Sequence, residues 1–555
     1  MPDATPSFPL RLRRWFASRG PGGWLLLFCG LAVLLRWGTF FISVINHDES
    51  TYIVIADELL RGEVYFRDVI DTKPIGIFWI YAGLIKLTGG AIPMLRLGAA
   101  LFVGGGAWGL YLGARRALGS NSAGIVAGVA YCWMCSVFTY YGLSPNAEIF
   151  FNLFTIGAVA LAVAPRAGGR RSPFWHWPVA GLLLGTAFVI KPFAAAEAGA
   201  IGLFLVWYYA RAGRWGRMLV GGASLIGAFM LSPVLSYLYF VGHDVTEAFW
   251  FYTVEVSGAY PVELAWYLRL KYVGDYLLRY APFVILAGAA GYSAWRRGQS
   301  GNTAVVGDGP AAGAGEVARK QGGEQSPTPE VQLRWQDTVG QLSSVNTTLP
   351  PSPVRTWWTY LMLQFVFVLI VVLLTGKRFG HYQVQLHPVL AALAACWYAH
   401  GRPLFPRWNG AWVRKYTPTG LLVLSLLMGL QHFNHYRQKD DLNRRMATWL
   451  SDHLGPDETF FCLSGGHVAY HLTDRPVPTP YVHNTLLFFE HHLRAFQIDE
   501  ATEASRLLAD PTVVYLTSRR HTGYGDNLLR RTLLNHFELV DTIPGNVEFY
   551  RRMED

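Results

Sequence analysis

The sequence NHDESTY, at residues 46–52, directly follows an apolar run at 22–44, and this junction decides how the chain is interpreted. A second polar stretch, DTKPIG at 71–76, comes shortly after it. About 20 apolar residues are enough for a helix to cross a bilayer. The acids and the lysine of these stretches therefore lie where the membrane meets water. An ionisable group at that level is a candidate functional residue.

The composition is typical of a polytopic α-helical membrane protein. Hydrophobic residues make up 52% of the 555-residue chain and charged residues only 15%. Apolar runs recur along the chain, which predicts eleven spans together with the first run. These runs lie at about 93–114, 121–141, 147–165, 176–192, 194–211, 217–241, 277–295, 356–375, 384–400 and 417–434. The net charge of +10 comes from arginine clusters between the runs, as in positive-inside anchors, and argues against a nucleic-acid partner.

The apolar run at 75–88 is shorter than the others. A helix of that length reaches about 21 Å, less than the roughly 30 Å of a hydrocarbon core. If this run crossed the membrane, clusters such as Arg115-Arg116 and Arg296-Arg297 would lie outside, against the positive-inside rule. We therefore expect a juxtamembrane or re-entrant helix within one external loop at 46–92.

The composition changes after the last span. Strand-like runs at 459–463, 513–517 and 547–550 alternate with polar helical patterns at 436–454, 498–509 and 525–536. These patterns predict a transmembrane catalytic domain at 1–434 and a small α/β domain at 435–555. The α/β domain is expected outside the cytoplasm, because an odd number of spans precedes it. Residues 298–354, rich in Gly, Ala, Pro, Gln, Ser and Thr, predict a disordered cytoplasmic loop.

Acids and bases recur at the predicted external ends of the spans. They are Asp48, Glu49, Lys73, Glu148, Lys191, Arg378, His381 and Tyr382. Each of them alone can be explained as a helix flank or an interface anchor. Their occurrence on one face nevertheless predicts a shared site.

This set of side chains fits the transfer of a group from a polyprenyl-phosphate carrier. A carboxylate can take the proton from an acceptor hydroxyl as it attacks. Cations stabilise the phosphate that leaves, Arg through a forked contact and Lys as a point charge. No cofactor is certain; a divalent cation between Asp48 and Glu148 is one option, and metal use stays open.

Four groups of residues carry a resemblance to known proteins. They are Asp48-Glu49-x-x-Tyr52, Ala56-x-x-Leu59-Leu60-x-Gly62, Lys73-Pro74-Ile75-x-x-x-Trp79 and Leu95-Arg96-Leu97. Over about 46–150 the chain resembles the aminoarabinose lipid A transferases and the related dolichyl-phosphate-mannose-protein mannosyltransferases, all in the GT-C glycosyltransferase superfamily. The resemblance is weaker around Lys191 and at 378–388.

The resemblance implies an inverting glycosyltransferase, a hexosyl- or pentosyltransferase that uses a polyprenyl-monophosphate sugar donor. It implies that Asp48 is the catalytic base and that Lys73 binds the donor phosphate. The second external acid, usually Asp in such enzymes, is Glu148 here. We predict Asp48, Glu49 and Glu148 as catalytic residues. The predicted contacts to the donor phosphate are Lys73, Lys191, Arg378, His381 and Tyr382.

The implied partners are the lipid-linked donor, a glycan, lipid or protein acceptor, and membrane lipids. The implied location is the cell membrane, with the active site and the C-terminal domain outside the cytoplasm. Neither the sugar nor the acceptor is determined by the resemblance.

The alternative function is a transporter or flippase of lipid-linked sugars. Transporters commonly have internal repeats and bind their substrate near the bilayer midplane. The sequence has no duplicated halves, and its charged residues cluster at one interface. Both observations favour an enzyme.

Overall fold

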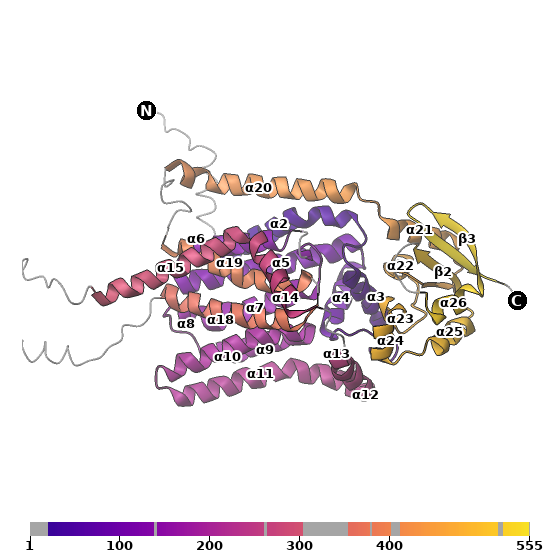
Figure 1. Cartoon of the computed structure of the whole chain (residues 1–555). Helices are drawn as coiled ribbons and strands as arrows, with labels where there is room; N and C mark the ends of the chain where they lie inside the picture. Colours follow the sequence, from indigo (N-terminus) through magenta and orange to yellow (C-terminus); the bar gives the residue numbers. More distant parts are fainter. Residues whose placement is uncertain are drawn as a thin grey trace, which may run out of the picture.

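The computed structural model describes residues 20–137, 141–259, 264–303, 353–377, 380–400, 411–519 and 526–553. A bundle of long helices makes up most of the molecule, and a small sheet region lies at one end of it (Figure 1). We call this end, where α3, α4 and the sheet meet, the sheet end. The fold class predicted from the sequence is confirmed. Most of the predicted disordered loop at 298–354 lies outside the described residues.

Six helical stretches in the described part of the chain are long and apolar enough to cross a membrane. They are Pro21–Phe41 (α2 and η1), Ile92–Leu118 (α5), Ala147–Ala167 (α7, η3 and α8), Pro192–Ala210 (η4 and α10), Trp215–Gly242 (α11) and Pro353–Leu374 (α18). Trp266–Arg279 (α14) and Ala281–Arg296 (in α15, Ala281–Thr303) meet at 86° and add a seventh if they form one bent span. By length and composition, the described residues contain six or seven candidate spans and not eleven. The predicted number of eleven spans therefore stays a prediction.

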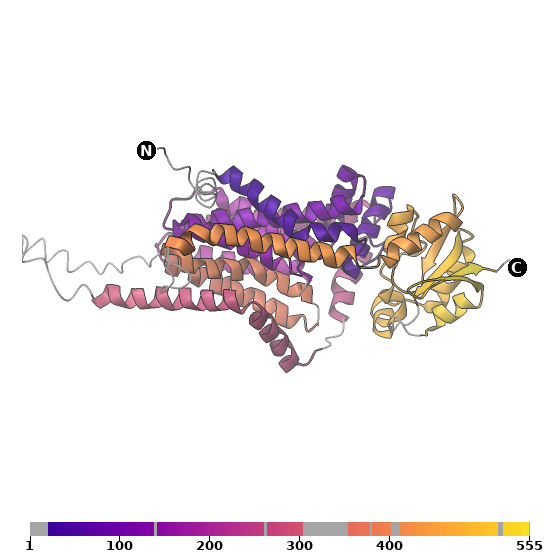
Figure 2. The same ribbon diagram turned by 90° about the horizontal axis from the view of Figure 1, so that it is seen from above.

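Other helices, most of them short or irregular and one of them long, lie in this part of the chain. They are α6 (Asn121–Met134), α9 (His176–Ile190), α12 (Thr246–Trp250), η5 (Phe251–Glu255), α13 (Val256–Ala259), η6 (Gly380–Leu386), α19 (His387–Ala395), η7 (Cys396–His400) and α20 (Ala411–Arg437). The long helix α20 runs along the outside of the bundle toward the sheet in both views (Figures 1 and 2). The rings of Trp37 and Phe433 stack with centroids 4.5 Å apart and attach α20 to η1.

The predicted external loop folds into two helices at the sheet end (Figure 1). Helix α3 spans His47–Arg61 and ends at Gly62, whose φ of 103° is the left-handed C-terminal cap that glycine favours. Helix α4 spans Gly76–Thr88 and is too short to qualify as a span. This is the arrangement expected of a juxtamembrane or re-entrant helix.

The C-terminal region contains a four-stranded sheet in the order β1-β2-β4-β3. Strand β1 (Thr459–Cys462) is parallel to β2 (Val513–Arg519), and β4 (Val547–Arg552) is antiparallel to β2 and to β3 (Phe537–Ile543). Its helices are α21 (Leu442–His453), α22 (Val468–Thr473), α23 (Thr485–Phe488), α24 (Glu490–Phe496), α25 (Glu500–Ala509) and α26 (Leu528–Leu534). Three strands lie where the sequence predicts them, whereas β3 was not predicted. The domain boundary at 434/435 stays a prediction.

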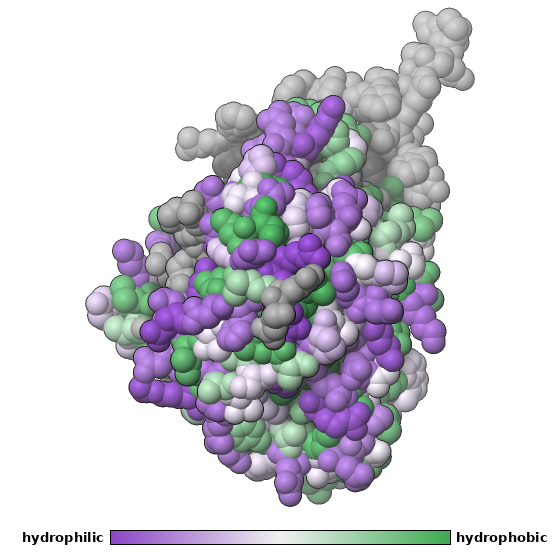
Figure 3. All heavy atoms as spheres, turned by 90° about the vertical axis from the view of Figure 1, so that its right-hand side faces the viewer, coloured by the Kyte–Doolittle hydropathy of each residue, from purple (hydrophilic) through white to green (hydrophobic). Residues whose placement is uncertain are grey.

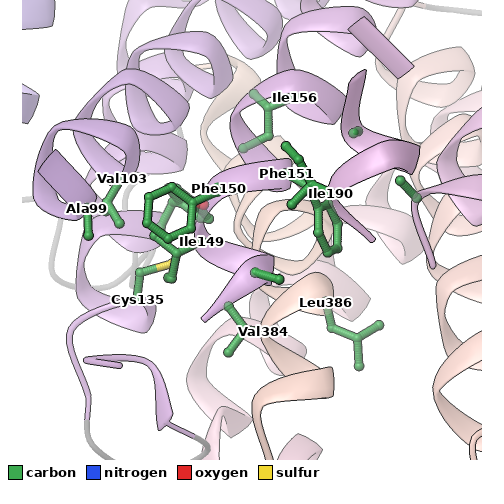
Figure 4. Packing of buried hydrophobic residues seen from close by; sticks show 14 of the residues in the cluster. Ala99, Val103, Cys135, Ile149, Phe150, Phe151, Ile156, Ile190, Val384 and Leu386 are labelled. Carbon is green, nitrogen blue, oxygen red and sulfur yellow. The ribbon is translucent and has the colours of Figure 1, made fainter. Parts of the chain in front are cut away.

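The buried core of the bundle holds the start of α7 and the segment η6 together. Ile149, Phe150 and Phe151 of α7 lie close to Val384 and Leu386 of η6 (Figure 4). All five side chains are buried in one hydrophobic cluster. Tight packing of this kind gives polar neighbours in the chain fixed positions. Glu148 and His381, which come just before these apolar residues, are therefore positioned by the core.

Candidate active site

Asp48, in the first turn of α3, lies at the centre of a group of charged side chains. Its Oδ1 is 3.1 Å from Nζ of Lys73, and its Oδ2 is 3.7 Å from Nε2 of His381. The same Lys73 ammonium lies 3.2 Å from Oδ2 of Asp71. Asp48 thus contacts one residue of its own loop and one residue of η6, more than 300 positions away in the sequence. Both contacts join residues that the sequence predicts for the site.

The loop that carries Lys73 is held in place by aromatic residues and one glycine. The hydroxyl of Tyr65 donates to the carbonyl oxygens of Asp71 (2.9 Å) and Lys73 (2.6 Å). The ammonium of Lys73 lies 5.5 Å from the ring centroid of Tyr52, within reach of a cation–π interaction. At Gly76, a Cβ atom would lie only 2.5 Å from the carbonyl oxygen of Val189. Glycine therefore lets α4 begin directly against the end of α9, next to Lys191.

A second ion pair joins Glu148, in the first turn of α7, to Lys191, which follows α9. The Lys191 ammonium bonds to Oε1 of the buried Glu148 carboxylate. It also lies 4.1 Å from the ring centroid of Tyr382 and 4.8 Å from that of Phe193. Three predicted site residues from three different elements therefore meet here.

The environment of Asp48 keeps it ionised. Burial alone would raise the pKa of the Asp48 carboxyl, but the Lys73 ammonium, followed by His381 and His483, holds it well below its usual range. Burial would lower the pKa of Lys73, yet Asp48 and Asp71 hold it above its ordinary value. At neutral pH the pair is therefore a carboxylate and a cation.

His381 lies between the two ion pairs. Burial lowers the pKa of its imidazole, and the charges of Glu148, Lys191, Asp48 and Lys73 also act on it. Its ring is therefore neutral at pH 7. Because all four charges act on this imidazole, the Asp48–Lys73 pair and the Glu148–Lys191 pair are electrostatically coupled to the same ring.

Glu49 and Arg378 differ from the other predicted site residues. Glu49 bonds to Arg96, whose Nη2 donates to Oε2 at 2.9 Å, and both side chains are 1% exposed. The structure thus places Glu49 in a buried ion pair with α5 rather than among the contacts of Asp48, and its catalytic role stays a prediction. Arg378 lies outside the described residues. Its neighbour Lys377 is described, and burial together with the charge of Lys73 lowers its pKa to about 8.

Three histidines next to Asp48 were not predicted from the sequence. The ring of His47 lies with its centroid 4.6 Å from that of His483 and 4.7 Å from that of His467. Nε2 of His467 is 2.8 Å from the hydroxyl of Ser50, and its Nδ1 is 2.9 Å from Oδ1 of Asn484. The C-terminal region thus reaches the start of α3. More than 400 residues separate the partners, so no spacing pattern in the sequence could have joined them.

No metal site is evident among the described residues, where no group of three or more His, Cys, Asp or Glu side chains could hold an ion. The two acids considered for a divalent cation, Asp48 and Glu148, are each bonded to a lysine. Cation binding by this pair stays a prediction.

Comparison with known proteins shows what this chain is similar to. The family model described as dolichyl-phosphate-mannose-protein mannosyltransferase matches residues 72–237. No curated protein matches the chain. Two solved structures of ArnT from Cupriavidus metallidurans, a lipid A aminoarabinose transferase, are similar to it at 13% sequence identity.

The two ArnT structures share the fold over nearly the whole chain. The structure bound to undecaprenyl phosphate has a TM-score of 0.59 and covers 96% of this chain and 98% of its own. The apo structure has a TM-score of 0.60 and covers 95% and 98%. The protein is an integral membrane protein with an ArnT-like fold, and its predicted resemblance to the GT-C glycosyltransferases is confirmed.

Proposed function

We propose that this protein is an inverting glycosyltransferase that moves a sugar from a polyprenyl-monophosphate donor to an acceptor outside the cytoplasm. The observation that carries the proposal is the position of the Asp48 carboxylate between Lys73 and His381. A base and a cation side by side are what transfer from a phosphate carrier needs. The undecaprenyl phosphate bound to the similar ArnT structure supports a carrier of this class.

In the proposed reaction Asp48 acts as the general base. The acceptor hydroxyl attacks the anomeric carbon from the face opposite the phosphate, and its proton passes to a carboxylate oxygen of Asp48. The bond between the anomeric carbon and the phosphate oxygen breaks, and the phosphate leaves with the electron pair. Inversion at the anomeric carbon follows from this single displacement.

Lys73 connects donor binding to the base. Without donor, its ammonium is shared between Asp48 and Asp71. A donor phosphate near Lys73 competes with Asp48 for this cation. Because the lysine is what lowers the pKa of Asp48, this competition makes the carboxylate a stronger base when the donor is present. Lys191, held by Glu148, is a second cation for the phosphate.

The test is turnover of labelled donors by the purified protein in lipid nanodiscs. Undecaprenyl and decaprenyl monophosphates carrying radiolabelled aminoarabinose, arabinose or mannose are mixed with a membrane extract of the source cells as acceptor. We expect label from at least one donor to appear in an acceptor product. Movement of an intact lipid-linked sugar across vesicles without turnover would instead support the transporter alternative.

A further inference from the structure

A cavity of about 360 Å³ lies between the first turn of α3, helix α21 and the sheet. This volume is within the range of about 300–1,000 Å³ that is usual for small-ligand sites. Its polar lining residues are His47, Ser50, Asn443, Ser464, Thr517, Ser518 and Arg519. Of the residues described above for the active site, only His47 and Ser50 line the cavity, and neither Asp48 nor its partners Lys73 and His381 do, so the cavity is distinct from the Asp48 group.

The cavity lies at the carboxyl ends of the two parallel strands β1 and β2. In sheets with parallel strands, ligands bind outside these ends. The turn after β1 contains Gly465 and Gly466, with φ values of 63° and 79°, which only glycine adopts readily. A Cβ atom at Gly466 would lie 2.5 Å from Cε of Met446 on α21. The turn is therefore packed directly against the opposite wall of the cavity.

Side-chain chemistry makes the cavity suitable for a hydroxyl-rich group. The hydroxyls of Ser50, Ser464 and Ser518 line it together with the amide of Asn443 and the guanidinium of Arg519. The serine hydroxyl oxygens can accept from sugar hydroxyls, and the amide of Asn443 and the guanidinium of Arg519 can donate to sugar oxygens. Apolar side chains contribute the rest of the wall, where the C–H face of a sugar ring can pack; they are Val44, Leu442, Met446, Val468 and Val547.

The first turn of α3 separates this cavity from the charged site. His47 and Ser50 line the cavity, while Asp48, between them in the sequence, contacts Lys73 and His381. Hydrophilic residues cover much of the sheet end of the molecule (Figure 3). An acceptor that approaches from this end can thus contact both the cavity and the neighbourhood of Asp48.

We propose that this cavity is an acceptor subsite, which binds a saccharide unit next to the one whose hydroxyl reacts. The proposal rests on the proposed function. The acceptor is then a glycan, or a lipid that carries a sugar headgroup. The C-terminal region selects the acceptor, whereas the helices and the loop at 46–92 bind the donor.

The first test fills the cavity. Asn443→Phe puts a bulky ring into it, and Thr448→Phe, at an exposed position of the same helix, is the matched control. In the nanodisc assay we expect Asn443→Phe to lower transfer to the extract about ten-fold or more, because it removes the contacts of a whole sugar unit. Binding of undecaprenyl phosphate should stay within about two-fold of wild type, since that site is separate. Undiminished transfer by a folded Asn443→Phe protein would overturn the proposal.

The second test does not depend on turnover. Saturation-transfer NMR of the full-length protein is recorded with free methyl glycosides of glucose, galactose, mannose and arabinose as probes. We expect at least one glycoside to receive saturation from wild type and from Thr448→Phe, and less from Asn443→Ala. If no glycoside binds to the wild-type protein, the subsite proposal is wrong, even if the protein turns over a donor in the nanodisc assay. If a glycoside binds as expected but no donor is turned over, the proposed function fails and the saccharide site stands.

Discussion

At the residue scale, the two neighbouring acids at the start of α3 differ in what they contact. Asp48 contacts Lys73 and His381 at the group of charges, whereas Glu49 bonds to Arg96 inside the bundle. Successive residues of a helix point about 100° apart, so adjacent side chains meet different surroundings. Asp48 is therefore suited to chemistry and Glu49 to attaching α3 to α5.

Glu49→Gln is predicted to destabilise the fold rather than to remove the chemistry. It leaves the Arg96 charge buried without its counter-ion, a change that costs about 3–5 kcal/mol in buried pairs. The melting temperature in detergent should fall clearly, while transfer per folded molecule should stay near that of wild type. A stable Glu49→Gln protein without transfer would instead support the catalytic role predicted from the sequence.

The sequence can predict which residues meet at the group of charges, because these residues lie at the ends of apolar runs. Asp48, Lys73, Glu148, Lys191 and His381 all occupy such ends, and the bundle brings these ends together. The histidines of the C-terminal region do not follow this rule. Their contact with α3 depends on how the sheet region packs on the bundle, which no local pattern encodes.

At the element scale, one histidine of α22 bonds to two residues of the loop at 46–92. Nδ1 of His471 lies 2.7 Å from Oδ2 of Asp57 on α3, and Nε2 lies 2.9 Å from the carbonyl oxygen of Gly90. Both partners are acceptors, so both hydrogen bonds form only when both ring nitrogens carry protons. Burial would lower the pKa of His471, but Asp57 and the Gly90 carbonyl raise it above its ordinary value.

This attachment is predicted to weaken as the pH rises. A folded-state pKa above the unfolded value means that the stabilisation is fully present below about pH 6.5 and is lost as the pH rises through the folded pKa. His471→Gln, which does not titrate, should cost about 1 kcal/mol at pH 6 and less at pH 8. Thermal melting of both proteins at both pH values checks this. An equal difference at the two pH values would contradict it.

The strands show which elements local sequence can predict. Runs of apolar and β-branched residues mark β1, β2 and β4, whose side chains are largely buried. Strand β3, with the sequence FELVDTI, lies at the edge of the sheet, and most of its residues are exposed. Since only Phe537 at its start is buried, the rest of β3 does not need alternating polar and apolar residues, and its sequence shows no clear alternation.

At the scale of the whole molecule, the polar site and the basic loops lie at opposite ends of the bundle. The connection between α10 and α11, which carries Arg211 and Arg214, lies at the end away from the sheet, and Arg217 follows in the first turn of α11 (Figure 1). The positive-inside rule places such a cluster in the cytoplasm. We therefore propose that the sheet end, with Asp48, faces away from the cytoplasm.

Single cysteines test this orientation in a background where Cys29 is replaced by serine and the other four cysteines are buried. A membrane-impermeant maleimide should label Arg494→Cys, at an exposed site on α24, in intact cells. It should label Arg214→Cys, at an exposed site before α11, only after permeabilisation. The reverse labelling pattern would show that the site faces the cytoplasm.

The most direct test of the central claim is sugar transfer by the Asp48→Asn protein in nanodiscs. The assay uses a donor that the wild-type protein turns over, with the membrane extract as acceptor. Asparagine has nearly the same shape but cannot accept the proton. We predict a folded protein with a somewhat lower melting temperature, because Lys73 keeps only Asp71 as its counter-ion. Binding of undecaprenyl phosphate should be retained, and the transfer rate should fall about 10²–10⁴-fold. Transfer at the wild-type rate by this protein would contradict the assignment of Asp48 as the base.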